Sequence, residues 1–278
     1  MIAAMLNEAW VAMGANRLRT FLTMLGMVIG VSAVILMLAI GQGAQQRVQA
    51  SIASMGSNLF IILSGSVTSG GVRMGGGATP TLTLADAQAL EELPLVVAVA
   101  PTSPGTAQIV YGSNNWSTQI SGTTPGFLIV RDWPLSSGAV FTESDIRSAT
   151  RVALLGQTVA RNLFGDEDPV GKTIRIKNSP YLVLGLLSAK GQSLDGRDQD
   201  DTVVVPVTTA QRKLFGSQFG GTVRFIMVQA ESDEAMPAVE RSMNELLRQR
   251  HRIREGADDD FSVRNLTALA NTAAETAK

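Results

Sequence analysis

Residues 21–40 read FLTMLGMVIGVSAVILMLAI, twenty consecutive positions without a charged side chain. An α-helix rises about 1.5 Å per residue, so a helix of this length spans about 30 Å, the thickness of the hydrocarbon core of a bilayer. The segment therefore predicts a transmembrane helix, and it decides the compartment of every residue that follows.

Basic residues beside the apolar segment predict its orientation. Arg17 and Arg19 come directly before it, whereas Arg47 is the one basic residue at a similar distance after it. Positive charge gathers on the cytoplasmic side of membrane spans, which places the N-terminus in the cytoplasm and the chain from about residue 45 outside it. A cleaved signal peptide is the alternative, since Ala39 and Gly41 are small, but the apolar core of a signal peptide is only about 7–15 residues long.

The helical pattern extends on both sides of this segment. Apolar residues at helical spacing over residues 1–16 predict an amphipathic helix in the cytoplasmic membrane interface. One apolar stripe continues after the segment, through Ala44, Val48, Ile52 and Met55. We therefore expect a single helix from Phe21 to Met55, about 50 Å long. A helix broken near Gly41 and Gly43 is the alternative.

The composition excludes several classes of function. The formal net charge is −1, so the chain lacks the concentrated basic surface that nucleic-acid binding needs. It contains no cysteine and one histidine, His251, which excludes disulfides and thiolate chemistry and predicts no metal site. Aromatic residues make up only 5%, which argues against an aromatic-lined small-molecule pocket. This profile is typical of a structural or transmitting domain.

Beyond the membrane segment, short strands and helices alternate, which predicts an α+β domain. We expect strands over Asn58–Leu63, Val96–Ala100, Ala107–Tyr111, Trp116–Ser121, Val152–Leu155, Thr173–Ile176, Tyr181–Leu187, Val203–Val207, Phe225–Gln229 and Phe261–Val263. We expect helices from Thr83 (capped with Asp86) to Leu93, from Thr142, over Thr158–Phe164, after Val207 to Leu214, over Glu234–Arg250 and after Asn265. Residues 136–138 are expected to form a turn, and 64–80 a flexible loop. We interpret residues from about 112 to 222 as an insertion, so that the segments before and after it share a sheet.

Several polar segments look like chemical sites but lack the required pattern. Residues 165–173, GDEDPVGKT, separate their glycines by five residues where a phosphate-binding loop needs four, and they precede a strand instead of a helix. Residues 195–201, DGRDQDD, lack the central glycine and distal glutamate of a calcium loop. These acidic residues and residues 258–260 are expected to form solvated loops. His251 lies among four arginines at a helix end, where cations favour the helix dipole, with a partner-binding patch as the alternative. We therefore expect no catalytic, cofactor-binding or metal-binding residue, and no enzymatic activity.

A set of motifs carries a family resemblance. These are NRLRTFLTMLG at 16–26 leading into IGV at 29–31, VALLG at 152–156 with LFG at 163–165 and DPVGK at 168–172, and PVTTAQR at 206–212 with LFG at 214–216. Together they resemble the MacB/FtsX-type ABC transporter permeases, the mechanotransmission group. The resemblance covers essentially the whole chain.

The resemblance implies a domain organisation. Residues 1–19 would form the cytoplasmic interfacial helix and residues 20–41 the transmembrane helix. A porter-like βαβ part of the periplasmic domain, with stalk helices, would comprise residues 42–111 and 223–278. A strand-rich inserted part would comprise residues 112–222.

The resemblance also implies a function. The chain would be a permease subunit of a MacB-like ABC exporter in the bacterial inner membrane, with its main domain in the periplasm. It would transmit the ATP-driven motion of a cytoplasmic ABC ATPase to the periplasmic domain and so move or extract a substrate. Expected partners are the lipid bilayer, the ATPase, a second copy of the chain and a periplasmic adaptor or outer-membrane component; no cofactor and no nucleic acid are expected.

Two points stay open at the level of the sequence. Members of the family continue into three further transmembrane helices, whereas this chain stops at Lys278, so we expect a fragment or a naturally truncated protein. The alternative functions are an FtsX-like envelope regulator that binds a cell-wall hydrolase and a single-span anchored binding module.

Overall fold

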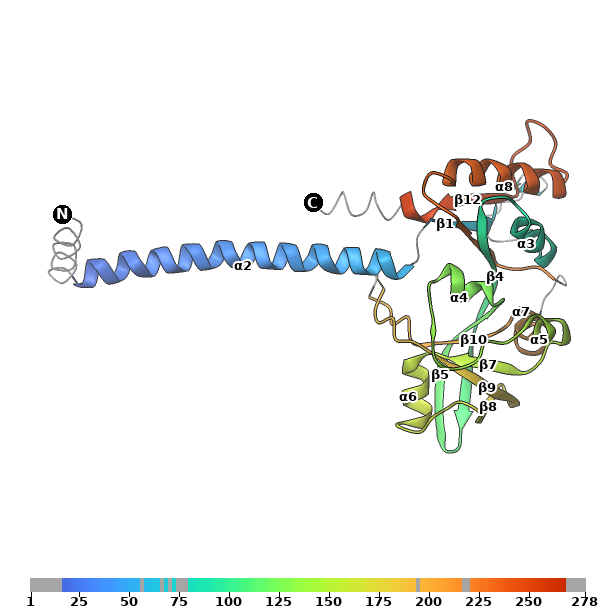
Figure 1. Cartoon of the computed structure of the whole chain (residues 1–278), viewed down its shortest axis with the longest axis horizontal. Helices are drawn as coiled ribbons and strands as arrows, with labels where there is room; N and C mark the ends of the chain where they lie inside the picture. Colours follow the sequence, from blue (N-terminus) through green and yellow to red (C-terminus); the bar gives the residue numbers. More distant parts are fainter. Residues whose placement is uncertain are drawn as a thin grey trace. The chain divides into compact units, whose positions relative to one another are not determined.

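The structure is a computed structural model of the chain (Figure 1). It describes residues 17–55, 58–65, 68–69, 72–73, 80–193, 196–216 and 221–268, and the side chains of all of these except 44–55, 68–69 and 72–73. The chain divides into two compact units, Met1–Gln49 and Ala50–Lys278, and each is described by itself. We call the second unit the head domain.

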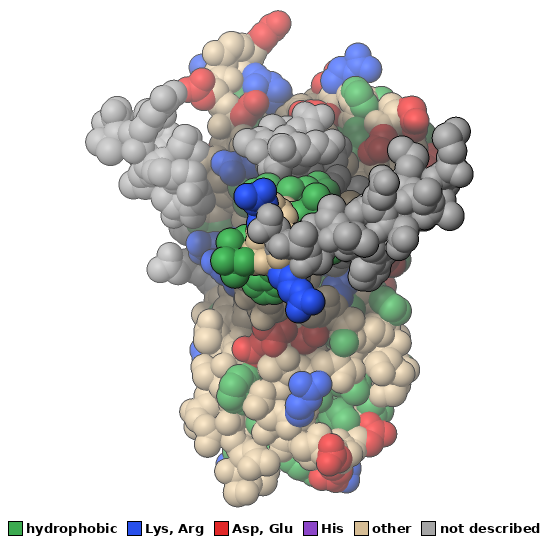
Figure 2. Space-filling model, turned by 90° about the vertical axis from the view of Figure 1, so that its left-hand side faces the viewer, with side chains coloured by type: hydrophobic (Ala, Val, Ile, Leu, Met, Phe, Trp, Pro, Cys, Tyr) green, Lys and Arg blue, Asp and Glu red, His purple; other side chains and the backbone are tan. Residues whose placement is uncertain are grey.

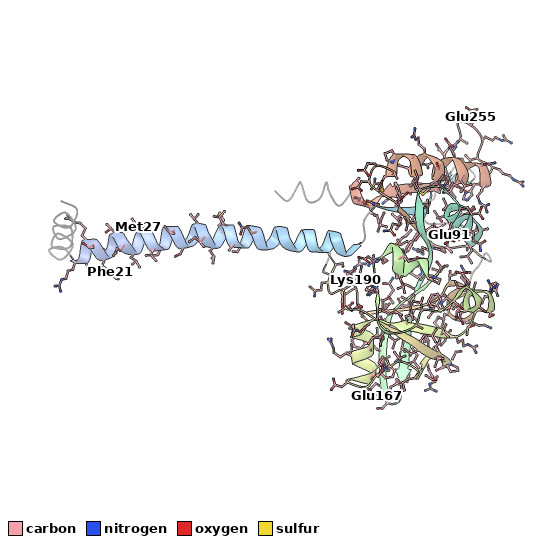
Figure 3. All side chains as sticks on the ribbon, in the orientation of Figure 1. Phe21, Met27, Glu91, Glu167, Lys190 and Glu255 are labelled. Carbon is pink, nitrogen blue, oxygen red and sulfur yellow. The ribbon has the colours of Figure 1, made fainter. Side chains whose placement is uncertain are left out.

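The first unit holds most of α2 (Arg17–Met55), which carries the predicted apolar segment. Arg17–Gly43 is long and apolar enough to cross a membrane, with a mean hydropathy that reaches 2.5, and none of it is buried. Phe21 and Met27 project from the helix with 62% and 71% of their surface exposed (Figure 3). Apolar side chains on all sides suit a helix to lipid rather than to water. The helix runs without a break through residues 41–43, as the continuous-helix prediction requires.

Three predicted features fall wholly or largely outside the described residues. They are the interfacial helix over residues 1–16, most of the loop expected at residues 64–80, and the last helix beyond Ala268. Within the loop the structure describes one antiparallel pair, β2 (Thr68–Ser69) with β3 (Val72–Arg73).

The head domain is built on one ten-stranded sheet. Nine strands follow the order β12-β1-β11-β4-β5-β10-β7-β9-β6, and β8 pairs with β4 and β9. Their bounds are β1 (Leu59–Ser64), β4 (Val96–Tyr111), β5 (Asn114–Thr123), β6 (Leu135–Gly138), β7 (Val152–Leu155), β8 (Thr173–Ile176), β9 (Ser179–Leu187), β10 (Thr202–Pro206), β11 (Phe225–Ala230) and β12 (Phe261–Asn265). The apolar N-terminal helix followed by this strand-rich domain confirms the predicted α+β class.

Short helices cover the sheet. They are α3 (Leu84–Glu91), α4 (Gly126–Val130), α5 (Glu143–Ser148), α6 (Gln157–Phe164), α7 (Val207–Thr209), a π-helical turn η1 (Ala210–Phe215) and α8 (Met236–Arg250). Thr83 and Asp86 form the predicted capping box of α3, and Thr142 forms an equivalent box with Asp145 at α5. These helices begin where the sequence predicts because a capping box is a local signal.

One long strand, β4, replaces two predicted strands. The predicted strands at 96–100 and 107–111 are one continuous element, whose first part pairs with β11 and whose second part pairs with β5. Proline lacks an N–H donor, so Pro101 in the middle of β4 needs an edge where no partner strand accepts from it. The Pro101 carbonyl accepts a hydrogen bond from Thr123 Oγ1 at 2.8 Å, on the side away from β11. The missing N–H therefore lies on the edge where β11 does not pair, and the proline is tolerated.

The predicted turn at 136–138 is wrong, because these residues belong to β6 and pair with β9. Gly138 has a φ of +85°, and a Cβ there would lie 2.1 Å from the Leu184 carbonyl oxygen. The glycine therefore permits β6 and β9 to approach closely. In the sequence, a glycine with this role looks the same as a glycine in a turn. The short helix α4 was not predicted either, since five residues, Gly126–Val130, are too few to show a helical period.

Strands β7 and β10 are buried on both faces. Leu154 and Val204 belong to one apolar cluster, whereas their neighbours Leu155 and Val203 belong to a second one. Figure 1 shows α6 on one side of these strands and α5 with α7 on the other. Two covered faces explain why both strands read as uninterrupted apolar runs.

The segments at the two ends of the head domain meet in the sheet. Strand β1 lies between β11 and β12 and is antiparallel to both, with Phe60 opposite Val228 on one side and Asn265 on the other. Strands from before the expected insertion, β1 and the first part of β4, therefore share this part of the sheet with β11 and β12 from after it. The boundaries of the inserted part, at residues 112 and 222, stay a prediction.

Candidate functional site

The chain enters and leaves the head domain at neighbouring positions. Strand β1 begins at Leu59, just after α2, and β12 ends at Asn265, opposite Phe60. The Leu59 N–H donates to Thr267 Oγ1 at 3.2 Å, and Asn265 Oδ1 accepts from the Ala268 N–H at 2.9 Å, which caps the helical segment that follows. Both connections of the head domain are thus tied to the same end of one strand pair.

This strand pair is anchored in the apolar core. The side chains of Phe60 and Ile62 are fully buried, while β11 pairs with the other edge of β1 from Leu59 to Leu63. Burial of a large apolar side chain stabilises a fold by about 1.5–3 kcal/mol. A displacement of β1 would therefore have to carry the surrounding core with it, because the core is close-packed.

The opposite end of the strand pair is held by two hydrogen bonds to the backbone carbonyl of Asp260. The Asp260 carbonyl accepts hydrogen bonds from the Gly65 N–H at 2.6 Å and from Thr81 Oγ1 at 2.7 Å. A Cβ at Gly65 would lie 2.7 Å from the backbone of Asp260, so only glycine allows this approach. Asp260 is thereby held where its side chain can reach the end of α8.

Four charged side chains meet at this end; we call them the acid–base cluster. Asp86 comes from α3, Arg250 and His251 from the C-terminus of α8, and Asp260 from the segment before β12. Arg250 Nε lies 2.7 Å from Asp86 Oδ1, and His251 Nε2 lies 3.2 Å from Asp86 Oδ2. The other ring nitrogen, His251 Nδ1, lies 2.7 Å from Asp260 Oδ1. The cluster therefore ties three elements of the head domain together.

The charges of the cluster stabilise one another. Hydrogen bonds to Asp86 and then Asp260 outweigh burial and raise the pKa of His251 to about 9, so the ring is protonated at neutral pH. Burial alone would raise the pKa of Asp86, but hydrogen bonds from His251, Arg250 and Thr83 bring it well below its usual range. The side chains of His251 and Asp86 are 8% and 5% exposed, so their pairing is little screened by solvent.

The arginine-rich end of α8 makes ion pairs within the head domain, which the sequence did not predict. The expectation there was a favourable interaction with the helix dipole, with a partner-binding patch as the alternative. Arg250 pairs with Asp86, and Arg248 pairs with Asp259, so two of its cations face the head domain itself. Asp260 contacts His251, which makes the prediction of a wholly solvated acidic loop wrong. The local sequence signals Asp86 only as a capping residue, and nothing in it indicates a partner 165 residues away.

Part of the other acidic segment, at residues 195–201, is also buried or hydrogen-bonded to the domain. Asp200 is 6% exposed and accepts hydrogen bonds from the backbone N–H groups of Lys190 at 2.8 Å and Gly191 at 3.0 Å. Asp201 accepts from Trp116 Nε1 at 2.8 Å. The prediction of a solvated loop is therefore wrong for these residues. Among the side chains that the structure describes, no three acidic or histidine groups are placed to hold a metal ion.

The segment that superficially resembles a phosphate loop is a turn. Gly165 ends α6 with a φ of +63°, and the strand β8 follows, as predicted. Lys172 Nζ, the cation that would contact a phosphate, lies 2.6 Å from Glu167 Oε1 (Glu167 is labelled in Figure 3). Asp168 Oδ1 accepts from the Val170 N–H at 3.0 Å, which occupies a donor that an anion would need.

Positive and negative side chains are mixed on the drawn face of the described head-domain residues (Figure 2). On the face drawn in Figure 2, Lys and Arg are interspersed with Asp and Glu over the head domain. This distribution gives no continuous basic stripe on that face for a polyanion to follow. The described residues thus form an apolar helix, long enough to cross a membrane, and a head domain of strands joined by ion pairs. That combination defines an α+β domain that follows a candidate membrane span in the chain.

The family is shown by comparison with known proteins. Residues 20–246 match the family described as "MacB-like periplasmic core domain", and the chain belongs to this family of ABC transporter permeases. It is 38% identical over 98% of its length to a protein of Syntrophobacter fumaroxidans named "Macrolide export ATP-binding/permease protein MacB", of which 45% is covered. A protein of the same name from Rhodospirillum rubrum is 40% identical, over 95% of this chain and 39% of that protein. The chain thus spans less than half the length of these relatives.

Two solved structures share the fold. The periplasmic region of MacB from Actinobacillus actinomycetemcomitans has a TM-score of 0.63 at 23% identity, covering 82% of this chain and 96% of that one. The extracellular domain of the noncanonic ABC-type transporter YknZ from Gram-positive bacteria has a TM-score of 0.58 at 20% identity, covering 75% and 100%. These likenesses confirm the fold, and the family match with the relatives' identity confirms the resemblance that the sequence motifs predict.

The acid–base cluster makes stability depend on pH. We expect His251→Ala, in the full chain, to lower the free energy of unfolding of the head domain by about 3 kcal/mol at pH 6, because it removes the buried cation that Asp86 and Asp260 share. The folded pKa of His251 is about 9, against 6.5 when unfolded, so its contribution is complete below pH 6.5 and is lost as the pH rises through 9. The deficit of the variant should therefore shrink over that interval in urea unfolding followed by tryptophan fluorescence.

Arg254→Ala is the matched control, because Arg254 is an exposed cation three residues away. It should change stability by less than about 0.5 kcal/mol. Burial lowers the pKa of Lys190 to about 8, so Lys190 makes the free energy of unfolding rise with pH above 8, opposite to the effect of His251. This contribution is the same in the natural chain and in the variant. It therefore cancels in their difference. A deficit that stays constant from pH 6 to 9 would contradict the role of the charged histidine.

Proposed function

We propose that this chain is part of the permease subunit of a MacB-like ABC exporter and transmits the ATP-driven motion of a cytoplasmic ATPase to its periplasmic head domain. The motion would move or extract a substrate on the periplasmic side. Membership of the permease family supports the class of machine, and the antiparallel pairing of β1 with β12 is the observation that carries the mechanism.

The strand pair suits transmission because it receives both connections of the head domain. Displacement of α2 acts on Leu59, and displacement of the segment after β12 acts on Asn265, which lies next to it in the sheet. Motions at the two points are therefore applied to one strand pair instead of to two independent surfaces. The acid–base cluster braces its other end against α3 and α8. In this mechanism the head domain moves as a unit.

The proposed topology places the N-terminus in the cytoplasm and the head domain in the periplasm, with α2 in the inner membrane. Arg17 and Arg19 before the apolar segment support this orientation. The proposed organisation has a porter-like part, residues 42–111 and 223–278, with residues 112–222 as the inserted part. The pairing of β1 with β11 and β12, which come from the two ends of the head domain, supports it. These boundaries belong to the proposal.

The partners follow from the same argument. ATP hydrolysis would take place on an ABC ATPase, since the relatives are named "ATP-binding/permease" and this chain corresponds to less than half of their length. Gly26 and Gly30 lie one turn apart on α2, and a Cβ at either would meet nothing within 4 Å. Small residues at this spacing let another membrane helix approach closely, which supports a homodimer. A periplasmic adaptor or outer-membrane component is a further proposed partner.

Cysteine labelling tests the topology, since the chain contains no cysteine of its own. We expect a membrane-impermeant maleimide to label Glu92→Cys, at an exposed position, in cells whose outer membrane alone is opened. Asn7→Cys should be labelled only after the inner membrane is opened as well. The reverse pattern, or a mature protein that lacks residue 7, would contradict the proposed anchor.

An efflux assay tests the function. Deletion of the encoding gene should raise the accumulation of a fluorescent macrolide in the cells, and the intact gene should restore the lower level. Complementation together with an ATPase that binds but does not hydrolyse ATP is the control and should fail. Unchanged accumulation of this and other cargoes, with a cell-wall hydrolase purified on the head domain, would contradict the exporter and favour the FtsX-like regulator.

A further inference from the structure

The hairpin of β4 and β5 carries no charge. No charged residue occurs between Glu92 and Arg131, a segment that contains both strands, although 17% of the whole chain is charged. The two strands pair in register up to a turn at Gly112 and Ser113. Charged side chains keep exposed protein surfaces soluble, so a surface element of this length usually carries several of them. The hairpin instead presents only uncharged groups.

One face of the hairpin is buried and the other is exposed. Ala107, Ile109 and Ile120 belong to the second apolar cluster, whereas the alternate residues of both strands point outward. We call this outward side the amide face. It consists of three cross-strand pairs, Thr106 with Gln119, Gln108 with Ser117 and Val110 with Asn115, and all of these except the half-buried Val110 are exposed.

The amide face has hydrogen-bonding groups to offer. Gln108 Nε2 donates to Asn115 Oδ1 at 3.1 Å, which leaves the Gln108 amide oxygen and the Asn115 amide nitrogen for another partner. Within the described part of the chain, the side chains of Thr106, Ser117 and Gln119 make no hydrogen bond. Amide and hydroxyl groups each donate and accept. The face therefore presents donors and acceptors side by side, over about 14 Å of strand.

The neighbouring strands mark the limits of the amide face. On one side β10 places Thr202 opposite Gln119, and on the other side β8 places the exposed Arg175 opposite Val110. A charged side chain thus lies at one corner of the face. Strands β4, β5, β10, β7, β9 and β8 pair in a closed ring, with the amide face on its outside. Strand faces of a small β-barrel bind oligosaccharides in the OB-fold, so a surface of this kind can serve as a binding platform.

The chemistry of the amide face excludes several classes of partner. A nucleic acid requires a concentration of basic side chains, and a charged peptide requires groups of opposite charge. A lipid or an apolar helix requires an apolar patch, whereas Val110 is the one apolar member of the face. The hydroxyl groups of a sugar match the face, because each hydroxyl both donates and accepts.

We propose that the amide face binds a neutral glycan, a chain of sugar rings whose polar groups are hydroxyls and uncharged amides. Gln108, Asn115 and Gln119 donate to the sugar and accept from it, and the hydroxyls of Thr106 and Ser117 add further hydrogen bonds. No charged side chain of the hairpin has to lose its water when the glycan binds. The cost of binding a partner without a countercharge is therefore low.

The inference goes beyond the proposed export function, because it concerns a ligand of the head domain. Figure 1 shows the tip of the hairpin at the lower end of the head domain and β1 at the upper end. A glycan on the amide face leaves the pair of β1 and β12 uncovered. Its binding can be measured without the ATPase, so the two proposals can fail separately.

The test uses saturation-transfer difference NMR on oligosaccharides added to the full chain in phosphatidylcholine nanodiscs, with empty nanodiscs as the blank. The probes are chitohexaose, whose rings carry uncharged acetamides, and maltohexaose, whose rings carry hydroxyls alone. We expect saturation transfer from the protein to the glycan with a Kd in the millimolar range. Tighter binding of chitohexaose assigns the face to an N-acetylated glycan, and tighter binding of maltohexaose assigns it to a glycan without amides; either order supports the inference.

Matched variants identify the surface. Gln108→Ala combined with Gln119→Ala removes both glutamine amides from the amide face and should raise the Kd about tenfold. Gln249→Ala removes an exposed amide from α8, outside the face, and should change nothing. Unchanged tryptophan fluorescence shows that the hairpin keeps its fold in the variants, because Trp116 lies in β5.

The inference fails if neither oligosaccharide receives saturation at millimolar concentration, or if the double variant binds them as the natural chain does. Ser117→Cys tests the other occupant that an uncharged face suits, a second copy of the chain. A disulfide between two copies that forms rapidly in membranes, and that chitohexaose does not slow, assigns the face to a contact between copies and overturns the inference. Absence of the disulfide, or its slowing by chitohexaose, supports the glycan site.

Discussion

The antiparallel pairing of β1 with β12 is the constraint on which the rest of the structure depends. It brings the first strand after the apolar helix beside the last strand of the head domain, although about two hundred residues separate Phe60 from Asn265. The intervening chain must leave this strand pair and return to it. The chain therefore enters and leaves the head domain at one place, so that in the proposed mechanism a load applied at either connection acts on the same few hydrogen bonds.

Two other features of the head domain are connected to this strand pair. The acid–base cluster closes the far end, where Asp260 precedes β12 and Asp86 begins α3, so the pair is braced at both ends. Strand β4 then continues the connection, since its first part pairs with β11 and its second part with β5. One strand thus joins the part of the sheet that holds β1 and β12 to the part that is buried on both faces.

The sequence predicts the elements that local patterns define. The strands at 152–155 and 173–176 and the capping box at Thr83 were placed correctly, because apolar runs and caps depend only on neighbouring residues. The continuity of β4 through Pro101 was missed, since it depends on which edge of the strand has a neighbour. Likewise, the charge pairing of His251 with Asp86 and the burial of Asp200 arise from long-range contacts that no local spacing encodes.

The most direct measurement locks the strand pair with a disulfide. Ile61 and Arg264 face each other across β1 and β12, so Ile61→Cys with Arg264→Cys should form a disulfide on oxidation, whereas Ile61→Cys with Ser262→Cys, two residues out of register, should not. ATP-driven efflux by cells that carry the oxidised Ile61–Arg264 pair is then compared with efflux after reduction. If the pair moves as a unit, the two rates are equal; a loss of efflux on oxidation that reduction restores would contradict the account.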